Sequence, residues 1–186
     1  MKKVVILTVL FLCGLLPATV QAANLANAIT LTPMAGGYLF EGNEHLGGRP
    51  AYGMALGYNL DAHWGIEAAY TYVPESKSST DPTVGWTVQG ARGDILYHFF
   101  PDQPLVPYLA AGGGSQFFEA INGRHNIDAV AEYGGGFKLF LRDGVALRGD
   151  VRHVIDFNTV SALPQHHYNN LIYMGGLTFQ FGEAKR

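Results

Sequence analysis

The sequence predicts an all-β fold, an eight-stranded antiparallel up-and-down transmembrane β-barrel, on three observations. Apolar residues recur at every second position in segments bounded by turn residues, which is the period of a β-strand. The connections between these segments alternate between long and short, as in barrels that have short turns at one membrane face only. One parity of each segment carries large apolar and aromatic residues, whereas the other carries glycine, alanine and a few charges.

The composition limits both fold and function. A length of 186 residues suits one domain. The 10 Tyr, 11 Phe and 24 Gly, with only 15% charged residues, exclude a largely disordered chain. The formal net charge is −3, from 12 Lys and Arg against 15 Asp and Glu, so the basic footprint of a nucleic-acid-binding protein is absent.

The first 22 residues have the pattern of a secretory signal peptide. Two lysines precede an apolar run, 4–16, which is shorter than the roughly 20 residues that a membrane-spanning helix needs. Val20 and Ala22 are small residues at the positions that a signal peptidase reads. Cys13, the single cysteine, lies in the apolar run, so the exported chain has no disulfide or thiolate site. We expect a signal peptide at 1–22, a β-barrel domain at 23–181 and a short tail at 182–186.

Turn residues set the limits of each expected strand. Leu60–His63 and Arg142–Gly144 form tight turns, and Pro101–Pro104 forms a short one. The intervening connections, 41–50, 74–83, 120–128 and 158–169, are longer and more polar, and this order is that of a bacterial outer-membrane barrel with short periplasmic turns. The expected strands are 29–40, 51–60, 64–73, 84–100, 107–119, 129–141, 145–157 and 170–181.

The residue types decide which parity faces outward. An eight-stranded barrel is only just wide enough for its own side chains, so more than a dozen aromatic rings do not fit inside it. A surface of glycine and alanine would in turn be poorly solvated. We therefore expect the large residues to face lipid and the small residues and charges to fill the lumen. Trp86 and Val88 fall on the inward parity, which suggests a bulge nearby. Rings expected at the two membrane interfaces are Tyr38, Tyr58, Trp64, Tyr72, Tyr97, Tyr108 and Tyr168.

Eight charged residues fall on the inward parity, four of each sign. Charges enclosed in a narrow barrel are costly unless they are paired, so we expect a network that largely plugs the lumen. A structural polar core is favoured over a gate or an ion path, because eight strands leave almost no free bore. The expected lumen charge network is Glu67, Arg92, Asp94, Glu132, Lys138, Arg148, Asp150 and Arg152.

The long connections carry a modest excess of acidic residues. They are interpreted as a solvated rim, with binding of cations or lipopolysaccharide as the alternative. The rim residues are Glu41, Glu44, Glu75, Asp81, Glu119, Asp128 and Asp156 against Arg49, Lys77 and Arg124.

Four stretches resemble the OmpA-like eight-stranded outer-membrane β-barrel family in their order and spacing. They are Thr32–Tyr38, Pro107–Gly114, Gly134–Phe140 followed by Val145–Arg148, and Tyr173–Phe181. The resemblance implies a barrel in the bacterial outer membrane without the peptidoglycan-binding domain of longer members, since only Gly182–Arg186 follow the last strand. It also implies an approximate assembly signal in the last strand, formed by Tyr173, Gly175, Leu177, Phe179 and Phe181.

The functional prediction is a structural or porin-like role in the cell envelope, without enzymatic activity, cofactor or metal. Expected partners are outer-membrane lipid and lipopolysaccharide, with the barrel-assembly machinery during biogenesis; no nucleic acid is expected, and the barrel is expected to be a monomer. A lipocalin-type binding barrel would need an apolar interior.

The main alternative is a lipid A hydrolase or acyltransferase that uses His153 with Ser115 or Ser161, although no motif surrounds either serine. A surface metal site is a further alternative, formed by His125, His153, Asp156, His166 and His167.

Overall fold

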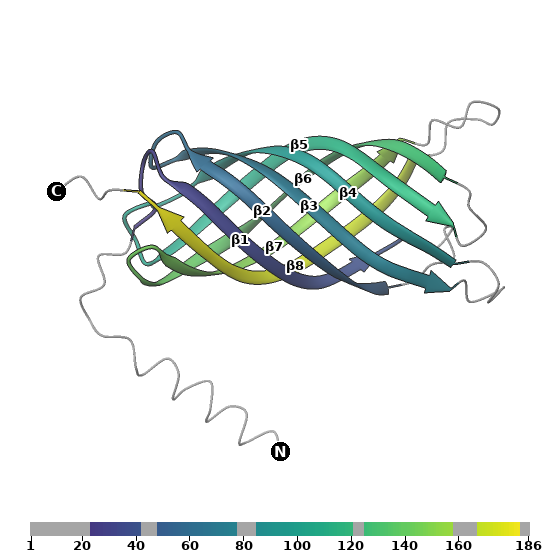
Figure 1. Ribbon diagram of the computed structural model, residues 1–186. Helices are drawn as coiled ribbons and strands as arrows, with labels where there is room; N and C mark the ends of the chain where they lie inside the picture. Colours follow the sequence, from purple (N-terminus) through teal and green to yellow (C-terminus); the bar gives the residue numbers. More distant parts are fainter. Residues whose placement is uncertain (1–22, 42–47, 78–84, 121–124, 158–166, 183–186) are drawn as a thin grey trace, which may run out of the picture.

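The chain forms one closed barrel of eight antiparallel strands (Figure 1). The computed structural model describes residues 23–41, 48–77, 85–120, 125–157 and 167–182. The predicted signal peptide and residues 183–186 of the predicted tail lie outside these residues. None of the described residues belongs to a helix long and apolar enough to span a bilayer. The strands are β1 (Ile29–Leu39), β2 (Gly48–Asn59), β3 (Trp64–Lys77), β4 (Gly85–His98), β5 (Leu105–Ala120), β6 (His125–Arg142), β7 (Val145–Phe157) and β8 (His167–Phe181).

Each strand pairs with its sequence neighbours, and β1 pairs with β8 to close the barrel. Closure gives every strand two hydrogen-bonded neighbours, which is what lipid requires of a spanning sheet. The predicted number, order and class of strands are therefore confirmed. Several strands extend further than predicted at the end where the long connections lie: β2 begins at Gly48, β3 continues to Lys77 and β6 begins at His125. Main-chain pairing continues there without apolar alternation, because ladder hydrogen bonds do not depend on side-chain polarity.

The opposite end, called the short-turn end below, is closed by tight turns. In the β2–β3 turn, Asp61 Oδ1 accepts hydrogen bonds from the main-chain N–H of His63 and of Trp64, both at 2.7 Å. The bond from Trp64, followed by that from His63, holds the pKa of this exposed carboxyl below its usual range. In the β6–β7 turn, Gly144 has a positive φ of 74°, which suits glycine. Its carbonyl accepts a hydrogen bond from Gln180 N at 2.7 Å.

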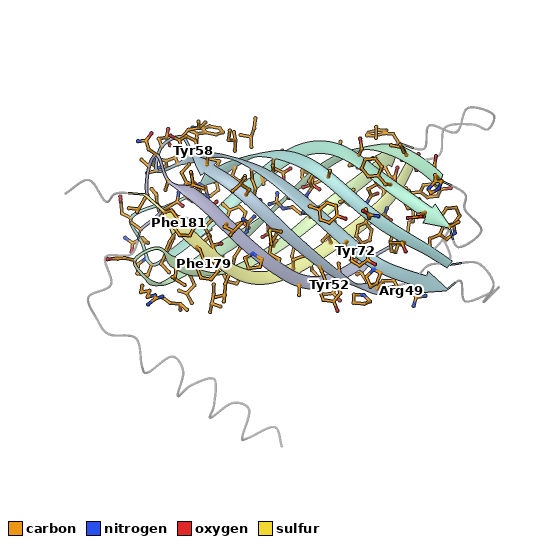
Figure 2. All side chains as sticks on the ribbon, viewed as in Figure 1. Arg49, Tyr52, Tyr58, Tyr72, Phe179 and Phe181 are labelled. Atoms are coloured by element: carbon orange, nitrogen blue, oxygen red, sulfur yellow. The ribbon has the colours of Figure 1, made fainter. Side chains whose placement is uncertain are left out.

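The outer face of the barrel is apolar, and the predicted orientation is confirmed. On β7, Leu147 and Val151 are 43% and 51% exposed, whereas Arg148 and Asp150 are 3% and 6% exposed. In Figure 2, side chains project outward beyond both edges of the barrel as viewed. Soluble proteins rarely expose an apolar surface of this extent to water, whereas membrane barrels present such a band to the hydrocarbon of the bilayer. Other exposed members of the band are Tyr52, Met54, Leu56, Tyr70, Ile95, Leu109, Tyr133, Tyr173 and Phe181.

Two of the seven rings expected at the membrane interfaces lie in the lumen instead. Tyr38 is 0% exposed and Tyr108 is 2% exposed. Tyr108 lies opposite Gly136 in the β5–β6 register, and a Cβ at that glycine would lie 2.6 Å from the Tyr108 hydroxyl. Gly136 thus leaves space for the inward ring of Tyr108. The prediction was wrong here because it placed tyrosines near strand ends at the membrane interface without considering the space offered by the neighbouring strand. Tyr58, Trp64 and Tyr72 are exposed on the outer face as expected, and Tyr97 and Tyr168 are half-buried.

The suspected irregularity near Trp86 and Val88 is confirmed. The β3–β4 register shifts between Val73 and Ser76, where β3 carries a bulge opposite these two residues. Val88 is buried in the lumen, and Trp86 packs against the same interior cluster.

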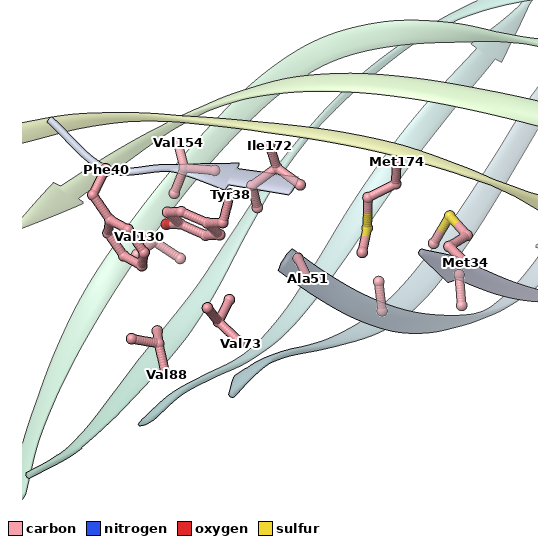
Figure 3. Packing of buried hydrophobic residues seen from close by; sticks show 12 residues of the cluster. Met34, Tyr38, Phe40, Ala51, Val73, Val88, Val130, Val154, Ile172 and Met174 are labelled. Carbon is pink, nitrogen blue, oxygen red and sulfur yellow. The ribbon is translucent and has the colours of Figure 1, made fainter. Parts of the chain in front are cut away.

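The lumen has a polar half and a mainly apolar half, although the sequence predicts small residues and charges throughout. In the half toward the long connections, called the long-loop end, a hydrophobic cluster occupies much of the interior (Figure 3). Its rings are Tyr38 and Phe40, stacked with centroids 4.3 Å apart. Its other large members are Val73, Val88, Val130, Val154, Ile172, Met34 and Met174.

Candidate functional site in the barrel lumen

Arg148 on β7 is the centre of the buried polar half. It forms a bidentate ion pair with Glu67 of β3, in which Nη2 lies 2.8 Å from Oε1. Its Nε donates to Asp150 Oδ2 at 2.6 Å and to the Tyr108 hydroxyl at 2.8 Å. Arg152 then donates through Nη2 to Asp150 Oδ1 at 2.8 Å. Each charge of this chain has an ionic partner, which is the form in which ions are tolerated inside a protein, although Arg152 Nη1 has no hydrogen-bond partner.

The Arg148–Glu67 pair crosses the full width of the lumen. Strands β3 and β7 are four positions apart in either direction around the closed order of eight, so they face each other across the barrel. A second contact crosses the lumen nearer the long-loop end: Gln116 Nε2 on β5 donates to the Tyr38 hydroxyl on β1 at 2.6 Å. β1 and β5 are also four positions apart. Opposite walls are therefore joined by side chains at two heights.

A second group of charges lies on the β4 and β6 walls. Arg92 Nε lies 2.9 Å from Glu132 Oε1 and 3.8 Å from Asp94 Oδ2. Arg92 Nη1 also donates to Thr71 Oγ1 at 2.7 Å. Neither carboxylate oxygen of Asp94 accepts a hydrogen bond, so this group is less completely satisfied than the group around Arg148. A cavity of about 10 Å³ adjoins it, lined by Arg92, Glu132 and Thr71 and by the hydrophobic cluster above them.

Lys138 is the remaining member of the predicted lumen charge network, and it contacts neutral groups instead of a carboxylate. Its Nζ lies 2.9 Å from His98 Nε2 and 3.4 Å from Asn24 Oδ1. His98 Nδ1 lies 3.0 Å from the His63 carbonyl oxygen, so a histidine protonated at Nδ1 donates to that carbonyl and accepts from the lysine.

Residues 23–28 lie across the mouth of the barrel at the short-turn end. Asn24 N–H donates to the Pro101 carbonyl at 2.9 Å, and its Nδ2 donates to the Ala62 carbonyl at 2.8 Å, so it binds two turns at once. Asn59 Nδ2 donates to the Leu25 carbonyl at 2.8 Å. Gln180 Nε2 donates to the Ala23 carbonyl at 3.1 Å.

Sequence reasoning missed five polar lumen residues that complete these contacts. Parity would have found two, because His98 shares the inward face of β4 with Arg92 and Asp94, and Asn59 shares that of β2 with small residues. Tyr108 and Gln116 lie on β5, where the sequence assigns no charge to the lumen. Nothing in the sequence indicates that the segment with Asn24, before β1, folds over the mouth. The five are His98, Tyr108 and Gln116, and then Asn24 and Asn59.

Two residues of the predicted acidic rim are lumen residues. Asp128 and Asp156 are 4% and 1% exposed. Asp128 lies within β6, which begins at His125 instead of the expected residue 129, and Asp156 lies at an inward position inside the expected strand 145–157. Glu119 is exposed, and Glu41 Oε2 accepts from Asn169 N–H at 2.7 Å. Arg49 is half-buried. The side chains of Glu75 and Lys77 are not described, and Glu44, Asp81 and Arg124 lie outside the described residues.

The fold and the inward charges point to one protein class, and comparison with known families decides it. Residues 8–182 match the family described as outer membrane protein beta-barrel domain. The chain belongs to this family. As an outer-membrane β-barrel protein, it has its short-turn end in the periplasm and its long-loop end outside the cell. No curated protein sequence matches the chain.

Several solved structures have the same fold at low sequence identity. The N-terminal β-barrel domain of Pseudomonas aeruginosa OprF is 18% identical and has a TM-score of 0.58; the match covers 84% of this chain and 98% of that one. Neisserial surface protein A (NspA) is 15% identical with a TM-score of 0.63, over 84% of this chain and 98% of that one. OprG from Pseudomonas aeruginosa is 13% identical with a TM-score of 0.55, over 89% of this chain and 100% of that one.

The residues of the alternative lipid-modifying reaction do not meet on this outer-membrane barrel. His153 lies on the outer face beside the Tyr133 ring, with centroids 5.1 Å apart. The β5 residue level with it in the register is Ala111, so Ser115 lies four residues further along β5, about 13 Å away along the strand. That separation is beyond hydrogen-bond reach of a base. Ser161 lies outside the described residues.

The histidines considered for a metal site are not gathered either. His153 points outward from β7 and Asp156 points inward, so these two cannot share an ion. His125 is exposed at the start of β6, while His166 and the side chain of His167 are not described. Within the described part of the chain, no group of three or more His, Cys, Asp or Glu side chains could hold a metal ion.

The predicted assembly-signal residues share the outer face of β8. Tyr173 and Leu177 are 48% and 39% exposed, and Phe181 is 60% exposed at the periplasmic end. Phe179 is half-buried on the same face and Gly175 is exposed. The outer face of β8 therefore presents these alternate residues to the membrane.

Proposed function

We propose that the protein is a structural component of the outer membrane whose lumen is sealed rather than open. The observation that carries the proposal is the Arg148–Glu67 ion pair, which joins opposite walls of the barrel. The Gln116–Tyr38 hydrogen bond repeats this arrangement at a second height. Residues 23–28 cover the periplasmic mouth, and the cavity between these levels, about 10 Å³, has room for about one water molecule.

The charges of the lumen support a structural role over a gate. Arg148 is 3% exposed and pairs with two carboxylates, so moving it would leave buried charges unpaired. The interior lined by Arg148, Asp150 and Arg152 also argues against a lipocalin-type barrel, which would need an apolar cavity. In this proposal, the barrel acts as a monomer in contact with outer-membrane lipid and lipopolysaccharide and has no enzymatic activity, cofactor, metal requirement or nucleic-acid partner. The barrel-assembly machinery recognises the outward face of β8.

Planar-bilayer conductance tests the sealed lumen. Protein refolded in detergent, and shown to be folded by its heat-modifiable gel mobility, is expected to insert without producing discrete conductance steps. An open porin added to the same bilayer serves as the control for detection. Reproducible steps of one size from the folded wild-type protein would instead support a porin-like function and contradict the sealed lumen.

A further inference from the structure

Three buried side chains with oxygen atoms lie in the extracellular half of the lumen, on the extracellular side of the lumen charge network. Gln116 of β5 and Asp128 of β6 are direct partners in the register, and Asp156 of β7 is the partner of Val130, two residues along from Asp128. All three face inward and are 4%, 4% and 1% exposed. They are called the acceptor cluster below.

The atoms of Asp156 and Gln116 that have no hydrogen-bond partner are all acceptors. Neither carboxylate oxygen of Asp156 has a hydrogen-bond partner. Gln116 uses its Nε2 to bind the Tyr38 hydroxyl, which leaves Oε1 as a buried acceptor without a partner. Asp128 Oδ2 accepts from Asn126 Nδ2 at 2.8 Å.

The charges in the acceptor cluster repel each other. Asp128 acts on Asp156 as a like charge, and no lysine or arginine in the described part of the chain forms an ion pair with Asp156. The four cations of the lumen charge network, Arg92, Lys138, Arg148 and Arg152, contact other groups nearer the periplasm. Burial of an ionised carboxylate is strongly unfavourable unless a positive charge accompanies it.

We propose that the acceptor cluster binds a divalent cation of the calcium type at the extracellular end of the lumen. The ligands would be the carboxylates of Asp156 and Asp128 and the amide oxygen of Gln116. Calcium binds oxygen ligands of these kinds, tolerates irregular geometry and completes its coordination shell with water and main-chain carbonyls. The third ligand is an amide rather than a carboxylate or imidazole, so the cluster has only two side chains of the types that usually mark a metal site. Bound metal would also fix Gln116, whose other end joins β5 to β1 across the lumen.

Luminescence of terbium, a calcium substitute excited through nearby aromatic rings, provides the test, since Tyr38 contacts Gln116 directly. The full chain is refolded in a zwitterionic detergent without lipopolysaccharide, so that lipid phosphates cannot supply the binding. Wild-type protein is expected to show saturable terbium luminescence that calcium displaces, and calcium is expected to raise its thermal unfolding midpoint. Asp156→Asn is expected to weaken the apparent affinity by about tenfold or more, because one of two charged ligands is lost.

Glu119→Gln is the matched control, because Glu119 is exposed at the same end of β5 and its substitution removes the same charge outside the lumen. This variant should bind like the wild type. The proposal is overturned if the wild type shows no saturable binding, if Asp156→Asn binds as well as the wild type, or if Glu119→Gln loses binding equally. It is also overturned if calcium leaves the wild-type unfolding midpoint unchanged while Asp156→Asn unfolds at a higher temperature, which is the behaviour of a neutral, protonated Asp156. Each outcome is independent of conductance, so failure here leaves the sealed lumen untouched.

Discussion

Replacement of Arg148 by methionine is expected to lower the free energy of unfolding by about 3–5 kcal/mol, the usual cost of breaking a buried ion pair by removing one partner. The loss is large because Arg148 bonds to both Glu67 and Asp150, and both carboxylates remain in a closed interior. Methionine nearly fills the volume of the arginine stem, so the effect comes mainly from the unpaired charges. Equilibrium unfolding by urea in lipid vesicles measures it.

The double variant Arg148→Met with Glu67→Gln separates charge from packing. It should be more stable than Arg148→Met alone, because one uncompensated carboxylate has been neutralised while Asp150 retains Arg152. If Arg148→Met alone loses less than about 1 kcal/mol, the crossing pair is not the main support of the lumen.

Replacement of Val151 by arginine is expected to destabilise the barrel by about 2–4 kcal/mol, the cost of a charged residue on the lipid face near the bilayer midplane. Val151 is the middle residue of β7 and is 51% exposed on the outer face. An arginine there must either lie in hydrocarbon or extend to a distant interface. The measurement is again equilibrium unfolding in vesicles.

Leu60→Arg is the control for this prediction. Leu60 is also 51% exposed but lies in the β2–β3 turn at the periplasmic end, where water is within reach of the guanidinium. Its cost should be about 0–1 kcal/mol. Equal costs at the two positions would show that Val151 does not face hydrocarbon.

The alternation of β7 explains why so much of the fold could be predicted. A period of two in a strand leaves only two choices of face, and the crowding of aromatic rings decides between them. The inward positions of Arg148, Asp150 and Arg152 follow from that single decision. The number of strands and the order of short and long connections follow from turn residues, whose conformational preferences are local.

The partners of those inward residues could not be predicted in the same way. That Arg148 reaches Glu67 depends on the stagger of the strands, which places β3 opposite β7 at a particular height. Tyr108 was misplaced for a related reason, since its inward ring depends on Gly136 in the neighbouring strand. Asp128 falls outside its expected strand because polar residues there indicate a strand end, whereas the pairing of β6 begins at His125. Asp156 lies inside the expected strand 145–157, so its inward parity should have placed it in the lumen instead of the rim.

The outward orientation of the aromatic residues is the central claim, and the chain's two tryptophans test it most directly. Trp64 is 47% exposed on the outer face, whereas Trp86 packs against the cluster inside the lumen. In vesicles of lipids brominated near the headgroup, fluorescence of Trp64 in the Trp86→Phe variant should be strongly quenched, relative to unbrominated lipid. Fluorescence of Trp86 in the Trp64→Phe variant should be nearly unaffected. Strong quenching of Trp86 together with protection of Trp64 would contradict the orientation and, with it, the proposal of a sealed lumen.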